Sequence, residues 1–198
     1  TMTSTSRPVD ASFPLRPLRG WGLVGWLLAN TVGFATMQLT LLALLGYFVQ
    51  GEPVNGKTVW GLLMVLILVG LAVAVPQWLI LQWRQASGRS WLWSATVAWS
   101  VAIALVLALA TQLFGWQRIP AGESTVGSAL VLLCFTLVGL GAGVGQALLL
   151  RWPARRRWRW AAINALAMVV AAPAMLIFVG GLGYGVVTAW AMQRWRWR

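Results

Sequence analysis

The residues of this chain best placed to bind something are uncharged polar side chains inside long apolar stretches. The most prominent are four carboxamides: Asn30, Gln77, Gln146 and Asn164. A neutral carboxamide can hydrogen-bond a quinone carbonyl or coordinate a chlorin magnesium, and the rings of Trp26, Trp99 and Trp190 suit a flat ligand. Two interpretations stay open. The amides join helices, at on the order of 1 kcal/mol each, or they belong to a site for a bound lipid, carotenoid or quinone.

The residues that most enzymes use are nearly missing from the chain. It has no His, three acidic residues and one cysteine, Cys134. Without His, the usual ligand of haem iron, chlorophyll or zinc is lacking, and a lone thiol has no disulfide partner. Asp10, Glu52 and Glu123 form no cluster for a hard cation or for acid–base chemistry. We therefore expect no catalytic residues and no metal site.

The composition excludes a water-soluble enzyme. Of the 198 residues, 60% are hydrophobic and 9% charged, and the mean hydropathy is +0.77. Soluble domains are about 45–50% apolar and about 25% charged, and a compact domain of this length could not bury so much apolar surface. The same hydrophobicity excludes a nucleic-acid-binding tail despite the net charge of +12.

The spacing of the charged residues predicts how often the chain crosses a membrane. They leave five long uncharged windows: residues 20–51, 58–83, 90–117, 124–150 and 160–193. About 20 apolar residues span a hydrocarbon core roughly 30 Å thick, so each of the first four windows predicts one spanning helix. The last window is too long for one helix and gives two short ones, with Pro173 and the glycines of 180–185 as the place to turn.

The basic residues favour six crossings and set the orientation. Lys and Arg near helix ends stay in the cytoplasm. With six helices and a cytoplasmic N-terminus, only Lys57 and Arg118 lie outside. The sequence thus predicts an all-α integral membrane protein with both termini cytoplasmic. The basic set of 14 Arg and one Lys, with abundant Ala, Gly and Trp, points to a bacterial genome and so to a bacterial inner membrane. Residues 1–19 form a cytoplasmic segment, and 20–198 form the transmembrane domain.

Short motifs recur along the chain. W-L-L-A-N-T-V-G-F at 26–34 matches W-L-W-S-A-T-V-A-W at 91–99 and W-A-A-I-N-A-L-A-M at 160–168. Q-W-L-I-L-Q-W at 77–83 matches Q-A-L-L-L-R-W at 146–152, and T-A-W-A-M-Q-R at 188–194 is a weaker copy. They predict three tandem, parallel helical hairpins, at about 21–83, 91–152 and 158–195, with the third shortened.

These motifs resemble those of a group of uncharacterised bacterial multi-pass membrane proteins. The shared features are a Trp where an odd-numbered helix begins and Q-x-L-x-L-R/Q-W where an even-numbered helix ends. The resemblance covers most of the chain. It implies a multi-pass architecture and carries no activity with it.

Tryptophan and arginine gather near the predicted inner boundary. Indole favours that depth, so we expect an interfacial belt made of Trp21, Trp78, Trp83, Trp91, Trp93, Trp152, Trp158, Trp160, Trp195 and Trp197. Basic residues between them hold loops in the cytoplasm, and can also capture anionic lipid headgroups at ~1 kcal/mol each or dock an acidic face of a partner. They are Arg151, Arg155, Arg156, Arg157, Arg159, Arg194 and Arg196.

Glycines spaced four apart predict where helices pack closely. The pairs are Gly139/Gly143, Gly141/Gly145 and Gly181/Gly185. The first two pairs lie on opposite faces of one helix, as expected of a central helix packed on two sides. Contact with another subunit is the alternative.

These features predict a non-catalytic accessory, structural or assembly subunit of a larger membrane complex, respiratory or photosynthetic. Its expected partners are membrane lipids and other integral membrane subunits. The alternative is a small transporter or channel for a neutral or lipophilic solute that passes along the four carboxamides.

Overall fold

A computed structural model describes residues 18–49, 56–84, 88–114, 125–175 and 179–194, and the regular structure within these ranges is helical. The six helices are α1 (Trp21–Val49), α2 (Gly56–Arg84), α3 (Gly88–Phe114), α4 (Thr125–Leu149), α5 (Ala154–Met175) and α6 (Gly180–Arg194). The all-α prediction is confirmed. Three of these helices contain segments long and apolar enough to span a membrane: Trp60–Gln82, Ser90–Leu109 and Ala129–Leu149.

The last uncharged window divides into two helices, as predicted, with α5 ending at Met175 and α6 beginning at Gly180, between Pro173 and the glycines at which the sequence placed the turn. Pro173 lies inside α5, which continues to Met175. Gly181 and Gly185 lie inside α6 and are buried, so they serve helix packing rather than the turn. With 15 residues, α6 is about 22 Å long, which is less than the roughly 30 Å of a hydrocarbon core.

The arginines expected in a loop before residue 158 are helical instead. Because α5 begins at Ala154, Arg155 and Arg157 lie in its first turns. The carbonyl of Pro153 accepts hydrogen bonds from the backbone N–H groups of Arg156 and Arg157, both at 3.0 Å, and so closes the first turn. The third hairpin therefore starts earlier than predicted.

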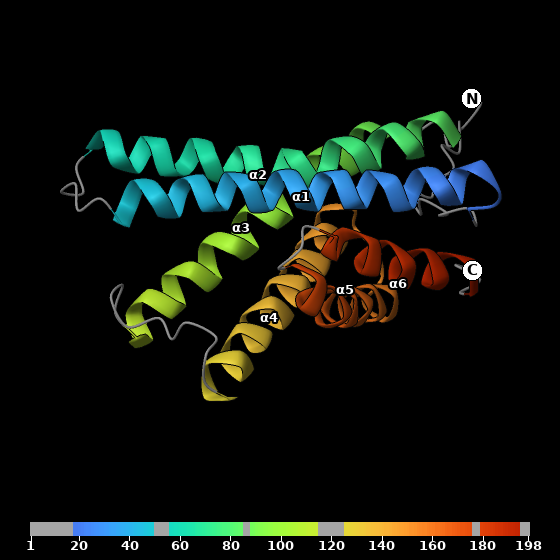
Figure 1. Ribbon diagram of the computed structural model, residues 1–198. Coiled ribbons are helices and arrows are strands. Elements are labelled where there is room, and N and C mark those ends of the chain that lie inside the picture. The colour runs from blue at the N-terminus through green and yellow to red at the C-terminus, as the bar shows by residue number, and fades with distance from the viewer. Residues whose placement is uncertain (1–17, 50–55, 85–87, 115–124, 176–178, 195–198) are drawn as a thin grey trace, which may run out of the picture.

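The helices form a closed ring (Figure 1). Each packs against its neighbours in sequence, and α6 packs back against α1. At the junction, the side-chain amide of Gln193 donates to the carbonyl of Leu18 at 3.1 Å, which holds the beginning of α1 beside the end of α6. Toward their far ends, α3 and α4 lean away from α1 and α2.

The repeated motifs build the core in layers. Each odd-numbered helix contributes a Trp, a residue four positions later and a residue eight positions later. These are Trp26, Asn30 and Phe34 in α1; Trp91, Ala95 and Trp99 in α3; and Trp160, Asn164 and Met168 in α5. All nine are at most 1% exposed. Trp91 touches the other two tryptophans of its layer edge to face, with ring centroids 6.3 Å from Trp26 and 5.9 Å from Trp160.

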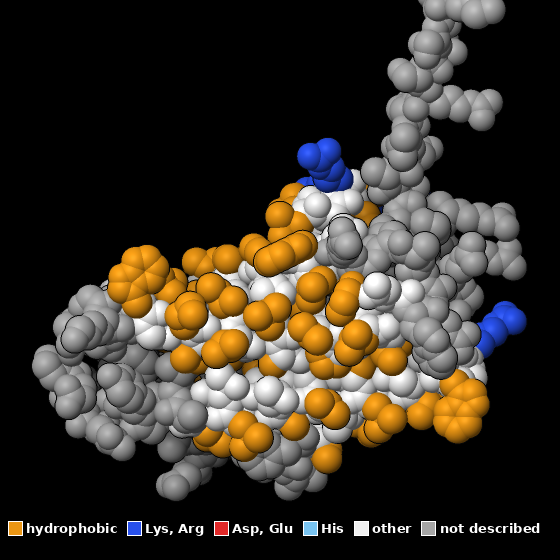
Figure 2. All heavy atoms as spheres, turned by 90° about the horizontal axis from the view of Figure 1, so that it is seen from above, with side chains coloured by type: hydrophobic (Ala, Val, Ile, Leu, Met, Phe, Trp, Pro, Cys, Tyr) orange, Lys and Arg blue, Asp and Glu red, His pale blue; other side chains and the backbone are white. Residues whose placement is uncertain are grey.

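Large apolar side chains cover the outside of the bundle. Trp60 is 71% exposed, Leu105 65% and Leu28 60%. Figure 2 shows the face seen from above, where hydrophobic side chains predominate and basic ones lie at the margin. Such a surface is suited to a lipid or protein neighbour rather than to water.

Candidate functional site: a polar belt and an arginine-rich end

A band of hydrogen-bonded side chains runs across the helices close to the end of the bundle where α1 begins. We call it the polar belt. Its members are Trp26, Asn30, Gln77, Trp91, Gln146, Trp160, Asn164, Tyr184 and Thr188. All are buried, and they include the four carboxamides singled out in the sequence.

Each odd-numbered helix donates an indole N–H to the even-numbered helix that precedes it around the ring. Trp91 donates to Gln77 Oε1 at 3.3 Å, and Trp160 donates to Gln146 Oε1 at 2.8 Å. Trp26 donates to Thr188 Oγ1 at 2.9 Å, across the junction of α1 and α6. The same contact therefore occurs three times, and Thr188 takes the place of Gln77 and Gln146 in the shortened third repeat.

A second set of bonds joins the two helices of a hairpin. Gln77 Nε2 donates to Asn30 Oδ1 at 2.8 Å, which links α2 to α1. The Tyr184 hydroxyl donates to Asn164 Oδ1, which links α6 to α5. Both asparagines also donate to a backbone carbonyl one turn back in their own helix, Asn30 at 2.7 Å and Asn164 at 2.9 Å.

The carboxamides are therefore occupied with one another rather than facing an open passage. Asn30, Gln77 and Asn164 each donate and accept within the protein. Gln146 differs, because only its oxygen has a partner. The geometry favours the interpretation that these residues join helices over the one in which they line a solute path.

The predicted glycine pairs lie at close helix contacts. A methyl group built on Gly139 would lie 2.7 Å from Met168 Cγ, and one built on Gly143 would lie 2.7 Å from Ala161 Cα, so this pair faces α5. Gly141 and Gly145 face α3 on the other side of α4. A wider side chain at any of these positions would force the helices apart.

The third pair faces α1, and a fourth position belongs with it. Gly181 lies against the backbone of Asn30, and Gly185 lies against Leu27. Gly70, which no Gly-x-x-x-Gly pattern marks, lies against Thr96 in the same way. The repeat could have revealed Gly70. Gly70, Gly139 and Gly181 each come seven residues before the residue that accepts the indole hydrogen bond, which is Gln77, Gln146 or Thr188.

The expected tryptophan belt is partly wrong. Trp91, Trp152 and Trp160 are each 1% exposed and belong to the core, because neighbouring helices cover them. Trp152 packs edge to face on Trp160, with centroids 5.9 Å apart. Trp21 and Trp93 are exposed, as are the rings of Trp158 and Trp60. Trp78 is partly buried, and the side chains of Trp83, Trp195 and Trp197 lie outside the described residues.

Of the three tryptophans considered for a flat ligand, Trp26 belongs to the polar belt, and the other two have different surroundings. Trp99 is buried, with its ring centroid 5.4 Å from that of Phe34 and 5.7 Å from that of Tyr184. The protein's own rings therefore occupy its neighbourhood. Trp190 is 47% exposed, with the guanidinium of Arg194 5.7 Å from its ring centroid.

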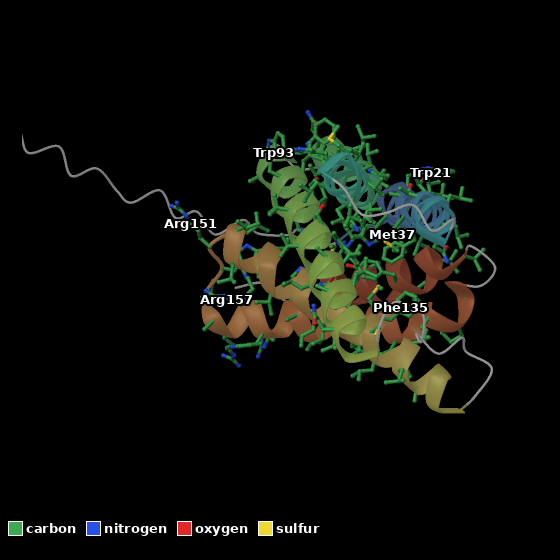
Figure 3. The ribbon with its side chains drawn as sticks, turned by 90° about the vertical axis from the view of Figure 1, so that its left-hand side faces the viewer. Trp21, Met37, Trp93, Phe135, Arg151 and Arg157 are labelled. Atoms are coloured by element: carbon green, nitrogen blue, oxygen red, sulfur yellow. The ribbon has the colours of Figure 1, made fainter. Side chains whose placement is uncertain are left out.

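The corner between α4 and α5 carries a dense group of cations, which we call the arginine-rich end: Arg151, Arg155, Arg156, Arg157 and Arg159. Figure 3 shows Arg151 and Arg157 at this corner. The guanidinium of Arg156 lies 5.5 Å from the centroid of the Trp152 ring, and Arg157 Nη2 donates to the Trp152 carbonyl at 3.3 Å. Partial burial lowers the pKa of Arg156 by desolvating its charge.

Arg151 has an unusual backbone conformation. It follows α4 with a φ of 54°, the left-handed region in which Gly is normally found at this place. The next residue closes the helix end, because Trp152 N–H donates to the carbonyl of Ala147 at 2.9 Å. Arg194 ends α6, whereas Arg196 lies outside the described residues.

Comparison with known proteins gives no relative from which a function could be inferred. No protein-family model, curated protein or solved structure matches the chain. The resemblance to bacterial multi-pass membrane proteins therefore stays a prediction. Within the described ranges, no group of three or more His, Cys, Asp or Glu side chains is placed to hold a metal ion.

Proposed function

We propose that this protein is a non-catalytic multi-pass subunit or assembly factor of a larger complex in a bacterial inner membrane, with six membrane spans and both termini in the cytoplasm. The observation that carries the proposal is that the side chains of the polar belt hydrogen-bond to one another across the helices. Its carboxamides bind neighbouring helices, and the exposed surface offers apolar side chains and an arginine-rich end. A protein with these features would act by packing against other membrane proteins and lipids.

Three features support the membrane placement of all six helices. Three helices have spans of sufficient length and hydropathy, and the other three pack against them in one ring. α6 is shorter than the hydrocarbon core is thick, but it packs along α1, which has 29 residues and is long enough to cross. The ring places the start of α1 beside the end of α6, in agreement with termini on one side.

The arginine-rich end supports contact with anionic headgroups. Cations in the first turn of a helix oppose its dipole, so Arg155, Arg156 and Arg157 are unfavourable for α5 itself. The part of the chain that the structure describes contains no acidic side chain to offset them. Anionic lipids at a membrane surface would supply the missing charge, at ~1 kcal/mol per basic residue.

The proposal is tested by photo-crosslinking in native membranes, followed by native mass spectrometry after extraction in mild detergent. A photoreactive residue at Leu105, which is exposed, should give a discrete adduct with another integral membrane protein. The same residue at Ala102, buried on the same helix, is the matched control and should give none. A lone monomer with no adduct at Leu105 contradicts the proposal.

A further inference from the structure

The polar belt has one gap. Its side-chain hydrogen bonds join α4 to α5, α5 to α6, α6 to α1, α1 to α2 and α2 to α3. The belt residues make no such bond between α3 and α4, although these two helices pack directly on each other. The gap therefore lies inside a hairpin, at the place where the other two hairpins are bonded.

This part of the belt also has an unpaired hydrogen-bond donor. Gln146 is 2% exposed, its Oε1 accepts from Trp160, and its Nε2 is buried with no partner. In the first hairpin, the equivalent Gln77 Nε2 donates to Asn30 Oδ1. The repeat places Ala95 at the position of Asn30 and Asn164. The middle hairpin thus keeps the donor but has lost the acceptor.

We propose that the gap holds a neutral oxygen acceptor, to which Gln146 Nε2 donates a hydrogen bond. A buried amide N–H without a partner is unfavourable, so such groups in native proteins are nearly always satisfied. The ligand is an acceptor because the free group is a donor, and it is neutral because the belt carries no charge. Replacing a carboxamide by the methyl group of Ala95 frees space on the order of one water molecule, ~30 Å³.

The position of Gln146 along α4 limits which molecules can supply this oxygen. Gln146 lies five residues before Arg151, which is about 7 Å along a helix. If the arginine-rich end lies among headgroups, this is the interfacial depth at which both water and the carbonyls of lipids occur. The depth rests on the proposed membrane placement, whereas the unpaired donor does not. The oxygen thus belongs to a buried water or to the carbonyl of a membrane-soluble molecule.

The test is the variant Ala95→Asn in the full chain, purified in detergent. The new carboxamide should displace the ligand oxygen and accept from Gln146 Nε2, as Asn30 does from Gln77. We expect the folding equilibrium constant to rise by up to roughly 5- to 10-fold, because the tethered amide oxygen replaces the bound oxygen without the entropic cost of immobilising a separate molecule. In a Gln146→Leu background, Ala95→Asn should give no such gain.

Two measurements on the unmodified protein distinguish the sources of the oxygen. A buried water gives a water-to-amide nuclear Overhauser effect on the Gln146 side chain in protein labelled with ¹⁵N-glutamine, assigned by its loss in Gln146→Leu. A carbonyl ligand gives one tightly bound molecule per chain by native mass spectrometry and extraction. Either signal should disappear in Ala95→Asn.

Ala98→Asn serves as the control, because Ala98 lies at the close contact with Gly145, where a larger side chain has no room. Loss of stability in Ala95→Asn equal to that of the control would overturn the proposal. Absence of both the water and the carbonyl signal would overturn it as well. Because the isolated chain is used, neither result depends on whether a partner subunit exists.

Discussion

The hydrogen bonds of Gln77 show how much a single side chain contributes to this bundle. Its amide accepts from Trp91 on one side and donates to Asn30 on the other, so one residue connects three helices. Lipid hydrocarbon cannot replace these partners, and the burial of Gln77 keeps bulk water away from them. Removing the amide leaves a donor and an acceptor unsatisfied at once.

We therefore predict that Gln77→Leu lowers the free energy of unfolding by about 1–3 kcal/mol. The measurement is a denaturant titration in detergent, followed by tryptophan fluorescence. Gln82→Leu is the matched control, since Gln82 lies on the same helix and is exposed. Equal stability of the two variants would contradict the role of the belt.

Arg151 allows stability to be separated from lipid binding. Its φ of 54° strains an L-residue by ~1 kcal/mol, and Gly relieves that strain. Arg151→Gly should raise the free energy of unfolding by about this amount, while weakening binding to vesicles of anionic lipid about fivefold. Arg155→Gly removes the same charge from the first turn of α5, where the lower helix propensity of Gly and the relief of the helix dipole oppose each other, so stability should change little while binding falls by the same factor. A destabilised Arg151→Gly would show that the arginine itself holds the helix end.

The sequence showed which residues were unusual for an apolar chain, but not which of them are buried. The four carboxamides were found because polar groups are conspicuous in apolar windows. Trp91 and Trp93 look alike in the sequence, yet one is buried and the other is exposed. Which face of a helix turns toward its neighbours depends on the arrangement of the other helices, and a tryptophan near a helix start suits both the core and a membrane interface.

Between helices, the spacing of small residues determines how closely the backbones approach. Gly139 leaves no room for a methyl group beside the carbonyl of Asn164, whereas Gly61 has open space around it. Gly139→Ala should therefore lower the free energy of unfolding by about 1–3 kcal/mol through overpacking. Gly61→Ala, the same change at an open helical site, should raise it by up to ~1 kcal/mol. Thermal and denaturant unfolding of both variants measures these changes, and effects of the same sign would contradict the packing described.

The number of helices was largely predictable, because charges are costly to bury in an apolar medium and so mark the ends of apolar segments. The helix boundary at Ala154 was not. A run of arginines indicates a solvated loop, but Pro153 starts a helix that continues through it. Gly70 was likewise missed, since its partner small residue four positions on is Ala74, which only the repeat makes noticeable.

For the whole molecule, the repeat explains why the ring closes. Three hairpins make equivalent contacts, and the last of these joins Trp26 of α1 to Thr188 of α6. A chain of three like units with one type of interface can satisfy all of its interfaces only by joining its last unit to its first. Closure requires that α1 begins where α6 ends, which is what the bond from Gln193 to Leu18 shows.

The most direct test of six membrane crossings is labelling of single cysteines with a membrane-impermeant maleimide, in a Cys134→Ala background. Arg19→Cys and Arg194→Cys, both exposed at the same end of the bundle, should react in inverted membrane vesicles and stay unlabelled in intact cells. Lys57→Cys, at the beginning of α2 beside the predicted outer loop, should react in intact cells. Labelling of positions 19 and 194 from opposite sides of the membrane would contradict the six-crossing ring.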